Sequence, residues 1–454
     1  MARLFGTDGV RGVAGTELTA QMCFDIGRAA AMVLTASSGQ AECPHKPRIL
    51  LGRDTRISGD MVQAALTAGF CAAGAVAVPV GVIPTPALAW LTREYRADAA
   101  AMISASHNPM EYNGIKFFNA DGYKLDDALE DRIEAMVRGA LHTLDLPSGA
   151  AVGTVEPVST AVEDYVSYIL TTIDTRLDGI RAAVDCANGA ASLTAPSALK
   201  KLGAELTVIH NEPDGVNINA GCGSTHMEDI QRLTVESGAD VGLAFDGDAD
   251  RLLAVDEKGN IVNGDQIMAI CGTYLKAQGK LKNDTIVATV MSNLGFFQMA
   301  EREGIQVPRT KVGDRYVLEK MLEEGDCLGG EQSGHVIFLE HNTTGDGLIT
   351  ALQLLSVMKH TGKPLSELAK VMTILPQVVV NVPVDNERKY DYIDDTEIME
   401  TIRKTERIFE DSGRVLIRPS GTEAMVRIMI EGQDLALMQQ KADEIAAVMR
   451  RNLK

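Results

Sequence analysis

Three aspartates at alternate positions are the strongest chemical signal in the sequence. Asp246, Asp248 and Asp250 stand in the run Asp-Gly-Asp-Ala-Asp-Arg, directly after an apolar segment. Three carboxylates separated by small residues can curl around a hard cation and supply the oxygen ligands that magnesium prefers. The spacing also fits an EF-hand whose last ligand is Glu257, but Arg251 takes the place of the obligatory glycine and strands flank the loop. The pattern predicts a metal site, with an acidic surface turn as the alternative.

A second polar loop, Ser-Ala-Ser-His-Asn-Pro at 104–109, also follows an apolar segment. At such a strand end, Ser106 can present its hydroxyl as a phosphate acceptor or an acyl nucleophile. No G-x-S-x-G elbow occurs, and nothing directs the neighbouring His107 ring at the Ser106 oxygen, so an acyl-transfer triad is disfavoured. A capped backbone turn is the alternative without chemistry. We expect this loop to face the surface.

Two further loops combine glycines with polar side chains. Glu331 and Ser333 are two residues apart in a glycine-rich segment and can hydrogen-bond vicinal hydroxyls or an amine, whereas the lone His335 is more often structural. The run Arg-Pro-Ser-Gly-Thr-Glu at 418–423 precedes Arg427, and its hydroxyls, backbone N–H groups and guanidinium groups suit a phosphate dianion. No Walker-type motif occurs, so nucleoside triphosphate binding is not implied. Ordinary turns are the alternative for both loops.

The elements that must position these loops follow one order three times: strand, loop, helix, strand, helix, strand. The strands are continuous apolar runs, which is typical of parallel strands covered on both faces. After about residue 372, strands that alternate apolar and polar residues precede a closing helix at 434–451. The predicted fold class is α/β, with three similar mixed α/β units and a smaller C-terminal α+β domain. Ligands in open α/β sheets bind beyond the carboxyl ends of the strands, so the polar loops should form the site.

Three repeated units and a smaller C-terminal domain make four predicted domains. Proline, glycine and serine gather between residues 144 and 160, and the strand pattern changes near residue 372, which marks two of the boundaries. The predicted ranges are 1–157 with the Ser106 loop, 158–258 with the aspartate loop, 259–373 with the Glu331 loop, and 374–454 with the arginine loop.

Composition disfavours several function classes. The 454 residues contain 43 Lys and Arg against 62 Asp and Glu, a net charge of −19 that repels nucleic acids and anionic bilayers, so we expect neither as a partner. The uncharged stretch 61–92 contains prolines and predicts helix, strand and turn rather than a membrane span. Seven scattered cysteines without a C-x-x-C pair, and a first segment unlike a secretory signal, predict a cytoplasmic protein.

Several motifs in a fixed order resemble one known family. Over essentially its whole length the chain resembles the α-D-phosphohexomutase superfamily. The motifs that carry the resemblance are Thr-Asp-Gly-Val-Arg-Gly at 7–12, the serine loop at 104–109 with Asn-Gly-Ile-Lys-Phe-Phe at 113–118, the aspartate loop at 246–251, Gly-Glu-Gln-Ser-Gly-His at 330–335, and the arginine loop at 418–423.

The resemblance implies four domains around a central cleft and a phosphoserine at position 106 in the active form. One magnesium ion per active site would be bound by the three aspartates and by an oxygen of the Ser106 phosphate. Arg11, His107 and Lys116 match positions that the family places around the phosphoserine, where Lys116 would neutralise charge or assist proton transfer. The residues that would contact the substrate are Arg251, Glu331, Ser333, His335, Arg418, Ser420, Gly421, Thr422 and Arg427.

The implied reaction is an isomerisation of a phosphorylated hexosamine by a monomer or homodimer. The Glu-Gln-Ser sugar loop and the Thr-Asp-Gly-Val-Arg opening favour glucosamine 6-phosphate, converted through a bisphosphate to glucosamine 1-phosphate for synthesis of the cell-wall precursor UDP-N-acetylglucosamine. The alternatives are phosphomannomutase or phosphoglucomutase activity, a metal-dependent phosphatase, and a non-catalytic calcium or sugar-binding protein.

Overall fold

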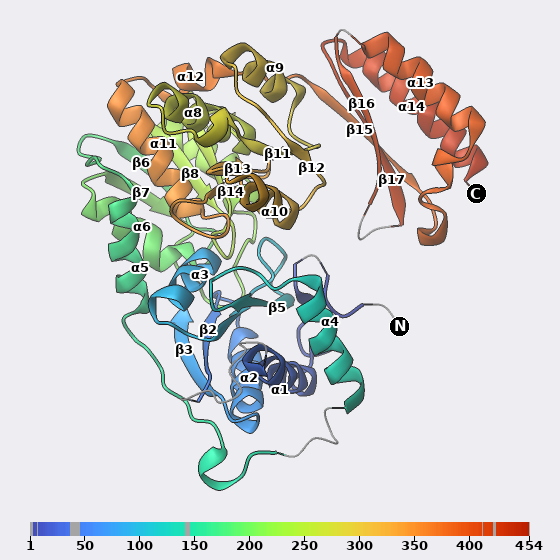
Figure 1. Cartoon of the computed structure of the whole chain (residues 1–454). Coiled ribbons are helices and arrows are strands. Elements are labelled where there is room, and N and C mark those ends of the chain that lie inside the picture. Colours follow the sequence, from blue (N-terminus) through green and yellow to red (C-terminus); the bar gives the residue numbers. More distant parts are fainter. Residues whose placement is uncertain are drawn as a thin grey trace. The chain divides into compact units, whose positions relative to one another are not determined.

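The computed structural model describes residues 3–6, 8–36, 46–140, 146–410, 412–420 and 424–453. The chain forms two compact units, which are treated separately below. The first unit comprises Met1–Met291 and Gly304–Val371, and the second comprises Ser292–Glu303 and Met372–Lys454. The first unit contains three sheets and the second contains one (Figure 1).

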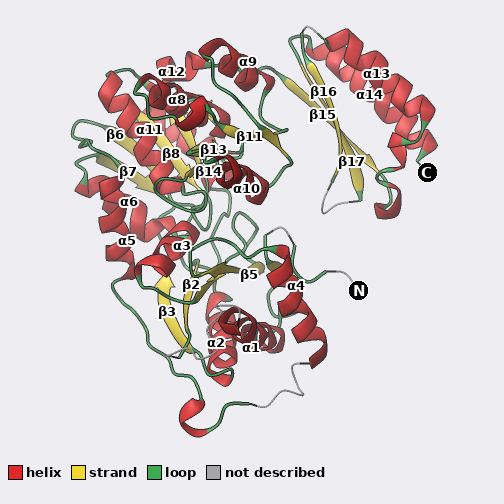
Figure 2. Ribbon diagram, in the orientation of Figure 1, coloured by secondary structure: helices red, strands yellow, loops and turns green. Residues whose placement is uncertain are grey.

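The first sheet has the strand order β1-β5-β4-β2-β3, in which β2, β3 and β4 are parallel and the two other strands are antiparallel to their neighbours. Helices α1, α2 and α4 cover the face that buries Ile49 and Leu51, and α3 lies on the other face (Figure 2). The strands are β1 (Val10–Val13), β2 (Arg48–Arg53), β3 (Val76–Val82), β4 (Ala99–Ile103) and β5 (Tyr112–Asn119). The helices are α1 (Ala20–Ala36), α2 (Gly59–Ala72), α3 (Thr85–Glu94) and α4 (Asp127–Ala135).

The second sheet has the order β10-β9-β8-β6-β7, and its last four strands are arranged as β5-β4-β2-β3 are in the first sheet, so that β8 corresponds to β4 and β6 corresponds to β2. The edge strand differs, because β1 comes first among its strands and β10 comes last. Its inner strands are buried on both faces, which explains their continuous apolar sequences. The strands are β6 (Arg181–Asp185), β7 (Glu205–Ile209), β8 (Val241–Phe245), β9 (Leu252–Asp256) and β10 (Ile261–Val262). The helices of this region are α5 (Ala161–Ile169), α6 (Ala191–Lys201) and α7 (Glu228–Glu236).

The third sheet is shorter and has the order β12-β11-β13-β14. Its strands are β11 (Val287–Thr289), β12 (Arg309–Thr310), β13 (Leu328–Gly330) and β14 (Val336–Phe338). The helices are α8 (Gly264–Ala277), α10 (Asp314–Glu324), α11 (Gly347–Thr361) and α12 (Leu365–Leu368). The start of α8 is fixed by a capping box, in which the Asn263 and Gln266 side chains each accept the other residue's backbone N–H.

The second unit is a three-stranded antiparallel sheet of order β15-β17-β16 with an apolar core against α13 and α14. Its elements are α9 (Leu294–Glu303), β15 (Gln377–Pro383), α13 (Thr396–Phe409), β16 (Arg414–Pro419), β17 (Met425–Glu431) and α14 (Leu435–Asn452). The expected alternating strands and closing helix are present. Helix α13 was not predicted, although Ile398, Ile402 and Phe409 give it an apolar stripe that the core buries.

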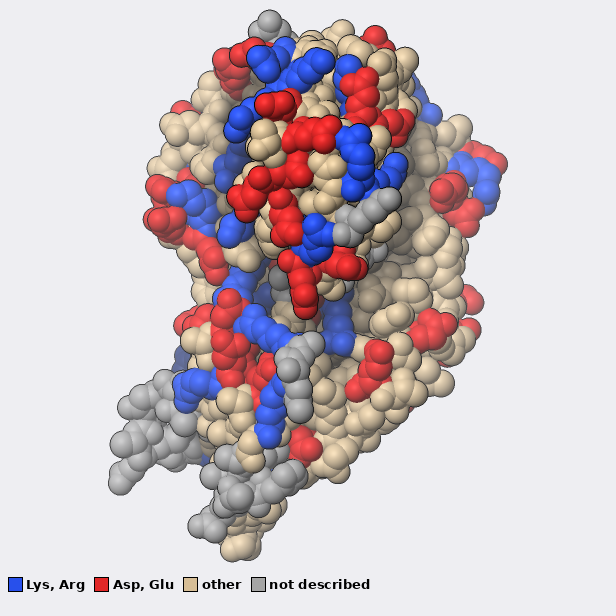
Figure 3. Space-filling model, turned by 90° about the vertical axis from the view of Figure 1, so that its right-hand side faces the viewer, with Lys and Arg blue, Asp and Glu red and all other residues tan. Residues whose placement is uncertain are grey.

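Basic and acidic side chains are interspersed on the face drawn in Figure 3, where Lys and Arg stand next to Asp and Glu. No helix in the described part of the chain is both long enough and apolar enough to cross a membrane. The six cysteines within the described ranges are free thiols.

Candidate active site

The serine loop and the aspartate loop meet inside the first unit. Ser106 follows β4 and Asp246 follows β8, and the Ser106 hydroxyl donates to Asp246 Oδ2 over 2.6 Å. Ser106 is 2% exposed and has a left-handed backbone with φ of 52°. The expectation that this loop faces the surface is wrong for Ser106, which lies buried against the aspartate loop, whereas Pro109 is exposed.

The close approach of the two loops depends on Gly247. A Cβ atom at this position would lie 2.6 Å from the Ser106 carbonyl oxygen and 2.8 Å from Asn219 Nδ2. Asn219 Nδ2 itself donates to the carbonyl oxygens of Ser106 (2.9 Å) and Asn108 (3.2 Å). A side chain at position 247 would therefore push the two loops apart.

Lys116, from β5, is the buried cation beside the aspartates. Its Nζ lies 2.9 Å from Asp248 Oδ2 and 3.7 Å from Asp250 Oδ2. Burial alone would lower the pKa of Lys116, but the attraction of the two carboxylates outweighs it and raises the pKa. Thr85 Oγ1 also donates to Asp248 Oδ2 over 2.5 Å. Lys116 therefore stays charged and holds one side of the aspartate loop.

The three carboxyl groups differ in their electrostatic environment. Burial and repulsion from Asp250 and Asp248 raise the pKa of Asp246 well above its ordinary value. Burial would also raise the pKa of Asp248, but the charge and hydrogen bond of Lys116, with the Thr85 hydrogen bond, lower it. The pKa of Asp250 is lowered well below its ordinary value, against burial, by Lys116, His335 and Arg251. The raised pKa of Asp246 thus reflects burial and repulsion within the triplet, which a cation bound there would relieve.

The aspartate triplet fits a metal ion. One carboxylate oxygen from each of Asp246, Asp248 and Asp250 lies within 4.8 Å of the other two. Asp248 Oδ1 and Asp250 Oδ1 are buried and have no hydrogen-bond partner in the described part of the chain. Buried carboxylate oxygens without donors are costly unless a cation approaches them, and an all-oxygen set suits a hard divalent cation.

His107 and Arg251 lie against the same loops. His107 Nδ1 is 3.4 Å from Ser106 Oγ and 3.2 Å from an Arg251 guanidinium nitrogen. Burial and the positive charges of Arg251 and Arg11 lower the pKa of His107 to about 4. The Arg251 backbone N–H donates to Asp246 Oδ1 over 3.2 Å, which ties this residue to the aspartate loop. A neutral imidazole beside Ser106 can accept a proton but supplies no charge.

The sequence analysis missed the residues that hold the serine loop from below. Arg56 is fully buried, and its Nε donates to Asp54 Oδ2 over 2.9 Å. Asp54 Oδ2 also accepts the Ser104 hydroxyl (2.7 Å), and Ser104 Oγ accepts the Ser106 backbone N–H (2.9 Å). The Arg56 guanidinium donates over 2.5–3.0 Å to the carbonyl oxygens of Ser106, Asn108, Pro109 and Tyr112. The polar run Asp-Thr-Arg directly after the apolar β2 was the available signal.

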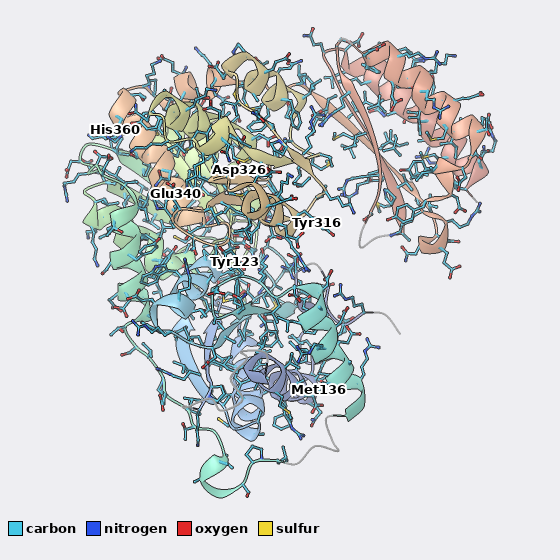
Figure 4. All side chains as sticks on the ribbon, in the orientation of Figure 1. Tyr123, Met136, Tyr316, Asp326, Glu340 and His360 are labelled. Atoms are coloured by element: carbon cyan, nitrogen blue, oxygen red, sulfur yellow. The ribbon has the colours of Figure 1, made fainter. Side chains whose placement is uncertain are left out.

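The glycine-rich loop after β13 contributes residues of two kinds. Glu331 Oε1 accepts the Gly313 backbone N–H over 3.0 Å and is part-exposed, and Ser333 is exposed. His335 is 2% exposed, with Nδ1 3.6 Å from Asp250 Oδ2 and Nε2 3.5 Å from Asp314 Oδ2. Asp314 also pairs with Lys124, next to Tyr123, which is labelled in Figure 4. His335 thus stands behind Asp250 rather than at the surface of the loop.

The arginine loop belongs to the second unit. Arg418 on β16 and Arg427 on β17 are directly opposite each other in the antiparallel pair. Burial and the charge of Arg427 lower the pKa of Arg418. The Ser420 carbonyl oxygen accepts from Lys389 Nζ over 2.7 Å. Gly421 and Thr422 lie outside the described residues. Neighbouring like charges of this kind would be relieved by a bound anion.

Four family models match successive parts of the chain. They are phosphoglucomutase/phosphomannomutase alpha/beta/alpha domain I at residues 2–142, domain II at 163–259, domain III at 263–374, and the C-terminal domain at 379–448. The chain therefore belongs to the phosphoglucomutase/phosphomannomutase family, as the motifs predicted.

The chain is also similar to individual characterised proteins. It is 58% identical to phosphoglucosamine mutase of Acetivibrio thermocellus over 453 residues, covering 100% of both chains. A phosphoglucomutase/phosphomannomutase family protein from Burkholderia thailandensis shares 24% identity with a TM-score of 0.83, covering 100% of this chain and 98% of that chain. Aspergillus fumigatus N-acetylphosphoglucosamine mutase, solved in complex with GlcNAc-6P and magnesium, shares 16% identity with a TM-score of 0.70, covering 99% and 96%. The predicted fold of three α/β units and a C-terminal α+β domain is confirmed.

Proposed function

We propose that this chain is a phosphoglucosamine mutase, an isomerase that interconverts glucosamine 6-phosphate and glucosamine 1-phosphate. The observation that carries the proposal is the hydrogen bond of 2.6 Å between Ser106 Oγ and Asp246, in a chain 58% identical over its whole length to a protein of that name. A hydroxyl held against an acidic metal loop is the arrangement that reversible phosphoryl transfer requires, because such catalysis is mainly positioning and charge neutralisation.

In the proposed reaction, Ser106 carries a phosphoryl group at the start. The bond between phosphorus and Ser106 Oγ breaks as a bond to the sugar 1-hydroxyl oxygen forms, and the proton of that hydroxyl ends on Ser106 Oγ. The resulting bisphosphate turns round, and its bond between O6 and phosphorus breaks as a new bond to Ser106 Oγ forms. The Ser106 proton passes to O6, and glucosamine 1-phosphate is released. Lys116 neutralises negative charge next to the reacting group, and Arg11 and His107 complete its surroundings.

Asp246, Asp248, Asp250 and an oxygen of the Ser106 phosphate would hold one Mg²⁺. When bound, this ion would neutralise negative charge on the phosphoryl group that is transferred. The two carboxylate oxygens without donors, on Asp248 and Asp250, support the assignment. Lys116 and Thr85 hold Asp248 through its other oxygen, Oδ2, so its Oδ1 remains available to a cation.

The substrate-binding residues are proposed by their match to the family motifs. Glu331 and Ser333 would bind sugar hydroxyls, and Arg251 would contact the substrate beside His107. His335 was predicted with this group, but its burial between two carboxylates favours a role in positioning Asp250. The residues proposed to hold the phosphate that is not reacting are Arg418, Ser420, Gly421, Thr422 and Arg427.

Two coarser features belong to the same proposal. The domain ranges 1–157, 158–258, 259–373 and 374–454 would each supply one loop of the site. A cytoplasmic location is supported by the free thiols of the described cysteines, since disulfides are the rule in oxidising compartments. There the product would supply amino sugar for UDP-N-acetylglucosamine synthesis.

The deciding experiment combines Ser106→Ala with intact-mass measurement. We expect the purified wild-type protein to carry one phosphoryl group on Ser106, and Ser106→Ala to lose it together with at least about 10³-fold in turnover. Ser237→Ala, an exposed serine after α7, should change neither quantity. Wild-type turnover in Ser106→Ala would refute the proposal. Release of free phosphate at the rate of substrate loss would indicate a phosphatase. Faster turnover of glucose 6-phosphate or mannose 6-phosphate than of glucosamine 6-phosphate would assign a different sugar substrate.

A further inference from the structure

Three chemically different side chains converge at the carboxyl edge of the second sheet. Asp185 ends β6, His210 follows β7, and Cys222 lies in the loop that leads to α7. A carboxylate oxygen, a ring nitrogen and the Sγ atom of these residues all lie within 4.8 Å of one another. Asp185 and Cys222 are fully buried, and the His210 side chain is 26% exposed. The three donors come from separate segments, so the tertiary fold alone brings them together.

The first sheet also has a buried carboxylate at its carboxyl edge and balances it with a different side chain. Asp54 follows β2, the strand that corresponds to β6, and the fully buried Arg56 guanidinium neutralises it over 2.9 Å. In the second sheet, His210 is the basic side chain that meets Asp185 among the described residues, with Nδ1 2.9 Å from Asp185 Oδ2. A histidine supplies a full positive charge only when it is protonated. The buried carboxylate of the first sheet thus faces an arginine, which is always charged, whereas that of the second sheet faces a histidine, which can bind a metal ion when neutral.

A second carboxylate stands on the far side of the His210 ring. Asp229 Oδ2 lies 3.6 Å from His210 Nε2, while Asp229 Oδ1 is 2.6 Å from an Arg232 nitrogen. A histidine that binds a metal through one ring nitrogen usually donates the other N–H to a carboxylate, which fixes the ring and raises its basicity. Asp229 is placed to accept that proton if His210 binds through Nδ1.

We propose that Asp185, His210 and Cys222 bind a zinc ion, at a site separate from the aspartate triplet. A thiolate, an imidazole and a carboxylate form a mixed set that suits Zn²⁺, whereas Mg²⁺ prefers oxygen ligands alone. On binding, the ion takes the place of the Cys222 thiol proton, which goes to solvent. The His210 proton moves to Nε2, facing Asp229.

Such an ion would brace the loop that supports the phosphoserine region. Asn219, three residues before Cys222, donates through Nδ2 to the carbonyl oxygens of Ser106 and Asn108. The Gly223 and Ala187 backbone N–H groups donate to the Asp185 carboxylate, so the loop is already anchored there. Three protein donors leave the fourth position of a tetrahedral zinc ion to water on the partly exposed His210 side of the site. The role inferred for the ion is to hold this loop, and zinc binding does not depend on the proposed function.

Cobalt(II) tests the proposal, because a thiolate ligand gives it a near-ultraviolet charge-transfer band that an all-oxygen site cannot give. The chelator-treated full chain would be titrated with Co²⁺ in excess Mg²⁺, which occupies the triplet. We expect one equivalent of Co²⁺ to produce the band and Zn²⁺ to abolish it. Cys222→Ala should lose the band, and Cys271→Ala, another buried cysteine on α8, should keep it.

No charge-transfer band in the wild-type chain, or a band that persists in Cys222→Ala, would overturn the proposal and leave the cluster as a hydrogen-bonded hub around Asp185. If Cys222→Ala does not fold, His210→Asn provides the second test, since this side chain is partly exposed. In that variant Zn²⁺ should no longer raise the midpoint of thermal unfolding, as it should in the wild type. An equal rise in both proteins would count against the site.

Discussion

The first and second sheets share the order of four strands, yet the loops at their carboxyl edges carry different chemistry. The strand β4 leads to Ser106, and β8, at the same place in its sheet, leads to Asp246. Both strands are fully buried and consist of apolar residues and glycine, so neither supplies a reactive group. The repeated fold thus provides two equivalent positions, and the residues that follow each strand decide what chemistry the position offers.

The supports beneath the two loops also differ. In the first sheet, Asp54 and Arg56 form a buried ion pair that holds the serine loop through its backbone carbonyls. In the second sheet, the carboxylates of the aspartate loop meet Lys116 from the first sheet. The serine loop is therefore held by Asp54 and Arg56 of its own sheet and also by Asn219, whereas the aspartate loop pairs with Lys116 from the first sheet and with its own Arg251. Substitutions in either loop test this difference.

The largest effect is expected from Asp248→Asn in the second loop. The change removes the negative charge that pairs with Lys116. The Asp248 carboxylate also has a buried oxygen, Oδ1, that accepts no hydrogen bond and is available to a metal ion. Turnover at a fixed Mg²⁺ concentration should fall by about 10²-fold or more, and the Mg²⁺ needed for half-maximal activity should rise. Asp240→Asn, at the opposite end of β8, is the matched control and should leave the metal titration unchanged. An unchanged Mg²⁺ titration in Asp248→Asn would mean that the aspartate triplet does not bind the Mg²⁺ that activity requires.

A smaller effect is expected from Arg56→Lys in the first loop. Lysine keeps the positive charge beside Asp54, but it lacks the planar guanidinium with which Arg56 donates to four backbone carbonyl oxygens. Some of these buried carbonyl groups would therefore lose their hydrogen bonds. The free energy of unfolding should fall by about 3 kcal/mol, as measured by urea denaturation. Arg53→Lys, a part-exposed neighbour paired with Asp60, should cost no more than about 1 kcal/mol. Equal losses in the two variants would mean that the serine loop does not depend on Arg56.

The smallest effect concerns the titration of His107, where the two loops meet. In the chain without phosphate on Ser106, NMR should give a pKa of about 4 for this imidazole. An unfolded histidine binds its proton near pH 6.5, so between these values the unfolded state binds more protons, and stability falls as the pH falls from about 6.5 to 4. A phosphoryl group on Ser106 adds negative charge and should raise the pKa of His107. A pKa near 6.5 before phosphorylation would mean that His107 is not enclosed by Arg251 and Arg11.

Much of the fold could be predicted from the sequence because buried parallel strands must be apolar throughout. The apolar runs 99–103 and 241–245 predict their strands, and the alternation of apolar and polar residues after residue 372 predicts the change to an antiparallel sheet. Helix α13 escaped prediction because no chemical motif directed attention to its otherwise clear apolar stripe. Burial of Ser106 also escaped, since a short polar loop gives no sign of the second loop that covers it.

The sequence by itself determined the candidate site residues: a serine, three aspartates, a glycine-rich loop and an arginine loop, each at or near the end of a strand. These depend on residue type and local spacing, which any linear pattern records. Tertiary structure alone decided the partners: Lys116 against Asp248, Asn219 against the serine loop, and Arg56 beneath it. Such pairs join residues 50 to 132 positions apart, and their electrostatic energies arise only when burial removes water from between the charges.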